Sequence, residues 1–234
     1  MALKAIPTPT ASRRHKISYE EYLETASETQ IMEWVNGEVI TYMPPLFEHQ
    51  DIVGFLVALL RNYVNYFQLG KVLPSPFTVK LWPTGPAREP DLLFIATENQ
   101  TNLTAKQFNG APELVVEIIS PSSVTEDRVR KFTEYEQAGV REYWLIDPRP
   151  HQQQADFYVL DETSILQPAP VSNEGIYTSA VLPHFWFDIA ILWQSPLPNP
   201  QLVLADVLRT HPDVPQPEQE IYQALYDSLA ARQA

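Results

Sequence analysis

The sequence of 234 residues contains no cysteine, only 7 glycines and no long hydrophobic run. Without cysteine, a disulfide framework, a thiolate zinc site and a cysteine nucleophile are all excluded. The longest apolar run, at 53–60, is far shorter than the roughly 20 residues that cross a membrane. We therefore expect no membrane partner and a cytoplasmic location. With 22 prolines against 7 glycines, the loops should be stiff.

Basic residues are also scarce, because 16 lysines and arginines face 29 acids, giving a net charge of −13 and a pI of about 4.7. Such a balance lacks the electrostatic footprint of a protein that coats nucleic acid. Residues 1–16 contain four basic residues and no acid. We expect them to form a flexible basic arm, with contact to phosphate groups as the alternative.

Local patterns predict both helices and strands. Asn36-Gly37 separates two β-rich runs, which is typical of a tight hairpin. Ser18 and Glu21 form a capping-box pattern at the start of a short helix. The other expected helices lie at about 48–67, closed by Gly70, at 124–138, closed by Gly139, and at 218–232. The expected strands lie near 71–73, 77–81, 92–95, 114–119, 143–148 and 156–160.

The segment 114–146 has a strand–helix–strand order, which predicts a crossover unit with a central strand covered on both faces. The fold class that follows is α/β or α+β, a mixed sheet flanked by helices. We expect the main domain to span 17–190 and Tyr143 and Trp144 to lie in its core. A Pro-rich segment with a final helix, 191–234, should pack against it or form a dimer contact.

Two carboxylates occupy positions where a strand would normally carry apolar residues. Glu117 lies inside the run Val-Val-Glu-Ile-Ile, and Asp91 opens the run 92–95. A metal ion, a cationic partner or a raised pKa would each make such carboxylates tolerable. A loop acid for Asp91 and an ion pair at a sheet edge for Glu117 are the structural alternatives. Both acids on neighbouring strands favour a site for a hard divalent cation.

A lysine on the following helix supplies the third element. Asp127, Lys131 and Tyr135 recur at i, i+4 and i+8, on one face of a helix that begins just beyond the strand of Glu117. Lys131 there could orient a water molecule or stabilise the charge of a phosphoryl transition state. The alternative is an ordinary helix ion pair between Asp127 and Lys131.

Taken in order, these segments resemble the Uma restriction-endonuclease family of the PD-(D/E)XK nuclease-like superfamily, over about 17–190. The motifs that carry the resemblance are Glu33-Trp34-Val35-Asn36-Gly37-Glu38, Met43-Pro44-Pro45, His49, Pro90-Asp91, Glu117-Ile118-Ile119-Ser120-Pro121-Ser122, Asp127-Arg128-x-x-Lys131-x-x-x-Tyr135 and Gly139-Val140-Arg141-Glu142-Tyr143-Trp144-Leu145-Ile146-Asp147-Pro148. The resemblance implies a restriction-endonuclease-like core in which Asp91, Glu117 and the main-chain carbonyl of Ile118 are ligands of Mg²⁺ or Mn²⁺.

The sequence departs from the superfamily pattern at one position. The superfamily motif has lysine two residues after the acid, and this chain has Ile119. Either Lys131 replaces that lysine, or the site lacks a lysine ammonium group and its activity is weak. The resemblance also makes Glu38 a candidate catalytic residue, with Glu33 and His49 as further candidate members of the site.

The leading hypothesis is Mg²⁺-dependent hydrolysis of DNA phosphodiester bonds, by a homodimer with one site per chain. The acidic balance requires a local basic surface, for which Arg128, Arg130, Lys131 and Arg141 are candidates. Two alternatives stay open. One is a catalytically inactive dimeric binding or regulatory module on the same fold. The other is a metal-dependent hydrolase of another phosphate substrate, such as RNA.

Overall fold

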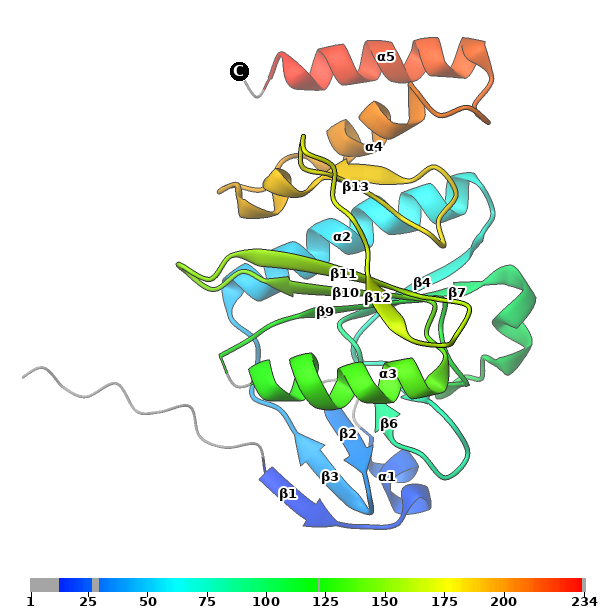
Figure 1. Ribbon diagram of the computed structural model, residues 1–234, viewed down its shortest axis with the longest axis vertical. Helices are drawn as coiled ribbons and strands as arrows, with labels where there is room; N and C mark the ends of the chain where they lie inside the picture. Colours follow the sequence, from blue (N-terminus) through cyan, green and yellow to red (C-terminus); the bar gives the residue numbers. More distant parts are fainter. Residues whose placement is uncertain (1–12, 27–29, 122, 233–234) are drawn as a thin grey trace, which may run out of the picture.

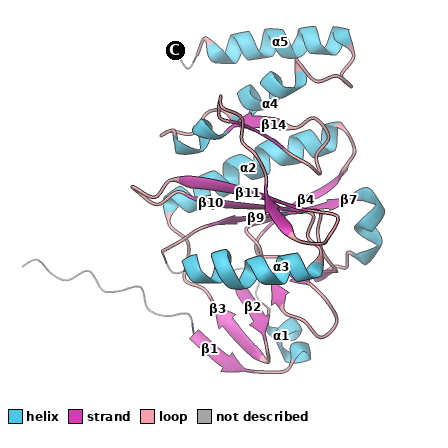
Figure 2. Ribbon diagram, in the orientation of Figure 1, coloured by secondary structure: helices cyan, strands magenta, loops and turns pink. Residues whose placement is uncertain are grey.

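The structure, a computed structural model, describes residues 13–26, 30–121 and 123–232. Its centre is a six-stranded mixed sheet with helices on both faces (Figures 1 and 2). In spatial order this sheet consists of β12 (Leu166–Pro168), β11 (Gln154–Leu160), β10 (Glu142–Asp147), β9 (Leu114–Ile118), β7 (Leu92–Ala96) and β4 (Gly70–Pro74). The expected crossover is present, since β9 and β10 are parallel neighbours. The predicted mixed sheet flanked by helices is therefore confirmed.

One face of this sheet is covered by the long helix α2 (Phe47–Tyr66), and the other by η2 (Glu126–Lys131) and α3 (Phe132–Ala138) (Figure 1). Alternate residues of β9 divide between the two faces. Val116 and Ile118 join the core under α2, whereas Val115 joins the core beneath α3. Tyr143 and Trp144 of β10 are fully buried, as expected of a central strand.

The helix expected at 124–138 is present, but η2 is wound as a π-helix rather than an α-helix. A π-helical turn inside a longer helix is rare and is frequently found at functional sites. The helix ends as expected at Gly139, whose φ of +88° is the left-handed conformation that favours glycine.

Gly70 does not close α2, contrary to the prediction. The helix ends at Tyr66 with Phe67 as its C-cap, and Gln68 takes the left-handed conformation with φ of +54°. Gly70 instead begins β4, where an added Cβ would lie 2.0 Å from the carbonyl oxygen of Ile95. Glycine is required there because the neighbouring strand approaches its backbone closely.

A second six-stranded sheet packs beside the helix formed by η2 and α3 (Figure 1). Its strands in spatial order are β1 (Arg13–Lys16), β3 (Glu38–Thr41), β2 (Met32–Val35), β6 (Ala87–Arg88), β5 (Thr78–Lys80) and β8 (Gln107–Asn109). Asn36-Gly37 forms the predicted hairpin turn, with φ of +51° and +82°. Helix α1 (Tyr19–Thr25) begins at Ser18 with the predicted capping box.

The end of the predicted arm is ordered in this sheet. Residues 13–16 form β1, which pairs with β3 in antiparallel register, so the expectation of a flexible arm is wrong for these four residues. Their backbone groups gain hydrogen-bonding partners at a sheet edge that the hairpin leaves open. Residues 1–12 lie outside the described part of the chain.

The C-terminal segment extends the core above α2. The remaining elements are η1 (Thr97–Asn102), β13 (Ile176–Thr178), β14 (Trp186–Asp188), η3 (Ile189–Trp193), α4 (Pro200–Leu208) and α5 (Gln216–Ala230). Val207 and Leu208 of α4 belong to the same apolar core as α2. Helix α5 packs outside α4 and buries no residue fully (Figure 1). Among the helices described, none combines the length and apolar character needed to cross a bilayer.

Candidate active site

Glu117 lies on β9, and Asp91 directly precedes the neighbouring antiparallel strand β7. Leu92 of β7 pairs with Val116 of β9, and extending that register by one residue places Asp91 opposite Glu117. Both side chains are buried and line the same cavity. Opposite residues in an antiparallel pair project to the same face of the sheet. The sheet therefore brings together the two acids on which the sequence analysis concentrated.

Asp91 is held by two donors. Its Oδ2 accepts a hydrogen bond of 2.7 Å from the backbone N–H of Ile118 and lies 3.1 Å from Nε2 of His49, in the first turn of α2. Burial lowers the pKa of His49, but the hydrogen bond and charge of Asp91 outweigh it and raise the pKa above its ordinary 6.5. The other ring nitrogen, Nδ1, is buried without a hydrogen-bond partner among the described residues.

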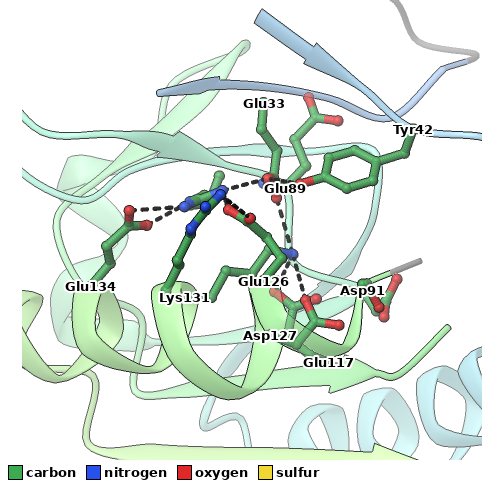
Figure 3. A network of polar contacts seen from close by, with 12 residues as sticks. Glu33, Tyr42, Glu89, Asp91, Glu117, Glu126, Asp127, Lys131 and Glu134 are labelled. Carbon is green, nitrogen blue, oxygen red and sulfur yellow. Dashed lines mark hydrogen bonds and ion pairs between the residues drawn. The ribbon is translucent and has the colours of Figure 1, made fainter. Parts of the chain in front are cut away.

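Lys131 lies at the centre of the carboxylates (Figure 3). Its Nζ is 2.9 Å from Oε1 of Glu117, 3.1 Å from Oε1 of Glu33 and 3.3 Å from Oδ1 of Asp127. Tyr135, one turn later, donates a hydrogen bond of 2.7 Å to the same oxygen of Glu117. The face predicted from the spacing of Asp127, Lys131 and Tyr135 thus points at Glu117.

The charges of this group determine its pKa shifts. Burial opposes the charge of Lys131, but Glu117, Glu33 and Asp127 raise its pKa well above 10.5, so it stays an ammonium. Burial raises the pKa of Glu117 well above 4.5. The positive charge of Lys131 opposes this increase, and the negative charges of Asp127 and Asp91 add to it. Burial and the neighbouring acids therefore make the charged form of Glu117 unfavourable, and a bound cation would relieve this repulsion.

Arg88 is a member of this network that the sequence analysis missed. It is fully buried, and its Nη1 lies 2.7 Å from Glu33 and 3.0 Å from Glu126. Its Nε and Nη2 bind both oxygens of Glu134, at 2.6 and 2.8 Å. Its position directly before Glu89 and the Pro90-Asp91 motif was a hint that Arg88 belongs to the site. A basic residue in a loop-like segment does not, however, by itself indicate burial.

Glu33 connects the two cations. Burial would raise its pKa, but Lys131, Arg88 and a hydrogen bond of 2.7 Å from the hydroxyl of Tyr42 lower it to about 2. Tyr42 was also missed by the sequence analysis. Since Glu33 is charged and bound on both sides, it fixes the position of Lys131 relative to the second sheet. A fixed ammonium is better suited to transition-state stabilisation than a mobile one.

The cavity above these residues has a volume of about 360 Å³. Its charged floor includes Asp91, Glu117, Asp127, Lys131 and His49. Among the residues that the structure describes, no three His, Asp or Glu side chains form a cluster that would enclose a metal ion. Mg²⁺ commonly takes only one or two protein carboxylates and completes its shell with water. The carboxyl oxygens of Asp91 and Glu117, which line this cavity together, fit such an ion.

Two positions singled out from the sequence, Glu38 and Ile119, lie outside this cavity. Glu38 of β3 lines a different cavity, beside Arg14 and Arg130, and is not brought to Asp91 and Glu117. The family motif made Glu38 a candidate member of the site, but the hairpin turn places it away from Asp91 and Glu117. Ile119 is buried in the apolar core with Tyr135 and Tyr143. This position, where the superfamily motif has lysine, therefore contributes no positive charge to the site.

The predicted basic surface is largely neutralised by acids. Arg128 lies 2.8 Å from Asp156 and 3.7 Å from Asp147, and Arg130 lies 2.9 Å from Glu126. Lys131 is buried within the site. Of the four predicted residues, Arg141 alone is exposed without an ion pair among the described residues, so these positions do not form an open stripe for a phosphate backbone.

Comparison with known proteins identifies the family. The profile of the Uma2 family, described as "Putative restriction endonuclease", matches residues 19–190. The chain belongs to the Uma2 family. The structure is similar to the crystal structure of "a putative nuclease belonging to DUF820" from Anabaena variabilis ATCC 29413, with a TM-score of 0.55 and 19% identity over 76% of this chain and 97% of that chain. At this identity the likeness shows a shared fold. Curated protein sequences give no match. The predicted Uma family membership and restriction-endonuclease-like fold are confirmed.

Proposed function

We propose that this Uma2 protein is a Mg²⁺-dependent endonuclease that hydrolyses DNA phosphodiester bonds. The observation that carries the proposal is the position of Lys131, whose ammonium lies 2.9 Å from Glu117 in a cavity that Asp91 also lines. Two buried acids are suited to holding a metal ion, and a fixed cation is suited to stabilising the charge of a phosphoryl transition state. Membership of a family of nuclease type supports the same reaction class.

In this proposal, Asp91, Glu117 and the carbonyl oxygen of Ile118 hold Mg²⁺ or Mn²⁺. The bound ion would lower the pKa of a water molecule and neutralise charge on the scissile phosphate. His49 and the N–H of Ile118 orient Asp91, and Tyr135 orients Glu117. Lys131 keeps Glu117 in place and presents positive charge towards the phosphate, the role for which Ile119 is unsuited.

The quaternary and cellular setting belongs to the same proposal. A homodimer would present two sites related by two-fold symmetry, which is the simplest way to cut both strands of a duplex with one site per chain. The cytoplasm is the compartment in which we expect it to act on DNA. Glu38, which lies in another cavity, is left out of the proposed catalytic group.

Cleavage of DNA by matched variants tests the proposal. Wild type should nick supercoiled plasmid with Mg²⁺ or Mn²⁺, whereas Asp91→Asn, Glu117→Gln and Lys131→Gln should each lower the rate at least a hundredfold. Glu38→Gln is the matched control, because it removes a family-motif acid that lies outside the cavity, and should cleave like wild type. Equal rates for wild type and the three site variants would overturn the assignment.

Two rival functions give different outcomes. An inactive binding module predicts no cleavage with either metal, and an Asp91→Asn/Glu117→Gln double variant at least as stable as wild type without metal. A hydrolase of another phosphate substrate predicts faster cleavage of RNA than of DNA in the same assay, with the same dependence on Asp91 and Glu117.

A further inference from the structure

An apolar loop stands beside the charged cavity. The chain between β3 and α2 carries Met43 and Leu46, which are 62% and 61% exposed, and α2 begins with Phe47, which is 77% exposed. Pro44 and Pro45 separate Met43 from Leu46 and restrict the backbone between them. We name these five residues the apolar rim. Large exposed apolar side chains gathered in one loop indicate a contact surface.

Four of the five rim residues share a cavity with the proposed catalytic groups. Met43, Pro44, Pro45 and Leu46 line the same space of about 360 Å³ as Asp91, Glu117 and Lys131. In Figure 1 the connection from β3 to α2 passes the start of the helix that carries Lys131. The site therefore has a charged floor and an apolar wall, and its volume lies within the roughly 300–1,000 Å³ typical of pockets for small ligands.

A nucleotide matches this division of the cavity. If the scissile phosphate lies at the carboxylates, the sugar and base joined to it extend along the wall formed by Met43, Pro44, Pro45 and Leu46. In a paired duplex the base faces its partner inside the helix and its edges are open only in the grooves. An unpaired base presents its whole face, which stacks on aromatic and apolar side chains.

The surrounding charges point the same way. Duplex binding depends on rows of free Lys and Arg along the phosphates. Here Arg128 and Arg130 are paired with acids, and exposed Glu48 and Asp51 follow the rim on α2. With few free cations beside the cavity, contact with a base gains importance relative to contact with phosphates.

We infer that the apolar rim receives a nucleotide base next to the scissile phosphate, and that the protein acts on unpaired DNA in preference to fully paired DNA. The inference deepens the proposed nuclease function and rests on it for the position of the phosphate. It assigns Leu46, which lines the cavity, and its exposed neighbour Phe47 as residues that determine substrate preference.

Binding without cleavage tests this directly. A fluorescein-labelled single-stranded oligonucleotide and its duplex are titrated with the full chain, with and without Mg²⁺, and anisotropy is measured. Wild type should bind the single strand more tightly than the duplex. Leu46→Ser/Phe47→Ser should lose about tenfold in affinity for the single strand, because the base loses its apolar stacking surface. Its affinity for the duplex should not change.

Ile221→Ser is the matched control, because Ile221 is an equally exposed apolar residue, 65% exposed, on the distant helix α5. It should bind both probes like wild type. Thermal melting verifies that each variant is folded. Unchanged single-strand affinity in the rim variant, or tighter binding of the duplex by wild type, would overturn the inference. So would dissociation of a dimer caused by the rim substitutions, since the rim would then contact a second copy of the chain.

The two proposals fail separately. Metal-dependent nicking without any single-strand preference would leave the nuclease function standing and remove the role of the rim. If the protein cleaves nothing but binds single-stranded DNA, and the rim variant loses that binding, the role of the rim stands and the nuclease function is removed.

Discussion

Lys131 and Glu117 meet across the crossover that joins β9 to β10, with Nζ 2.9 Å from Oε1 although the residues are 14 positions apart. Both side chains are buried, and Glu33 and Asp127 lie on the same ammonium. One cation therefore compensates carboxylates from β2, β9 and η2. The stability of the fold and the chemistry proposed for the site therefore both depend on the ammonium group of Lys131.

Lys131→Met should destabilise the protein by about 3–5 kcal/mol, because removing one partner of a buried ion pair leaves uncompensated charge behind. Urea unfolding at neutral pH measures the change. Arg130→Met is the control, since the neighbouring Arg130 is a largely exposed partner of Glu126. An exposed pair of that kind contributes roughly 0–1 kcal/mol. A loss for Lys131→Met no greater than that for Arg130→Met would contradict the central role of the ammonium.

Addition of Mg²⁺ should raise the melting temperature of wild type, because an ion that binds only the folded state stabilises it, by about 2.7 kcal/mol at a concentration of 100 times Kd. Asp91→Asn and Glu117→Gln should reduce or abolish this shift, whereas Glu38→Gln should keep it. Differential scanning calorimetry with and without the ion measures the effect independently of cleavage. The same shift in all four proteins would show that the ion binds elsewhere.

His211 should make stability depend on pH at the junction of α2 with the C-terminal segment. Its Nε2 lies 2.9 Å from the hydroxyl of Tyr63, and its Nδ1 accepts a hydrogen bond from the N–H of Asp213. Burial lowers its pKa below the ordinary 6.5, and the charge of His184 adds to this effect, against the carbonyl of Pro183 and the carboxylate of Asp213.

The folded state therefore favours neutral His211, and the stability this provides is complete above pH 6.5 and is lost as pH falls from 6.5 through the lower folded pKa. His211→Asn should show a smaller decrease in unfolding free energy between pH 7 and pH 5 than wild type. Chemical denaturation across this range is the measurement. His151→Asn, at an exposed histidine, should retain the wild-type slope. Identical slopes in all three proteins would show that His211 does not titrate differently on folding.

Local elements were predictable where a few neighbouring residues decide the structure. The Asn36-Gly37 turn, the cap at Ser18 and the end of a helix at Gly139 depend on backbone preferences that act over two to four residues. Gly70 was misassigned because its requirement for glycine comes from Ile95 on another strand. The strand β1 was missed because its pairing partner β3 is distant in sequence.

The candidate site divides in the same way. Asp91 and Glu117 were conspicuous because each interrupts or opens an apolar strand, and helical spacing placed Lys131 on a common face with Tyr135. Arg88 and Tyr42 were not conspicuous, since nothing near them in sequence shows that they are buried against Glu33. Glu38 lies close to Glu33 in sequence, yet the hairpin places it in another cavity.

The amino-acid sequence by itself determined the mixed α/β class and the crossover unit and singled out two acids and one lysine, because periodicity and residue chemistry are local properties. The family followed from the resemblance of its ordered motifs to known ones. Only the tertiary structure decided which charges meet. Contact between Lys131 and Glu33, burial of Arg88 and the shared cavity of the apolar rim and the acids all join segments distant in the chain. Such contacts arise from sheet register and helix packing. Burying an unpaired charge is costly, so only arrangements in which each buried charge meets a partner are stable.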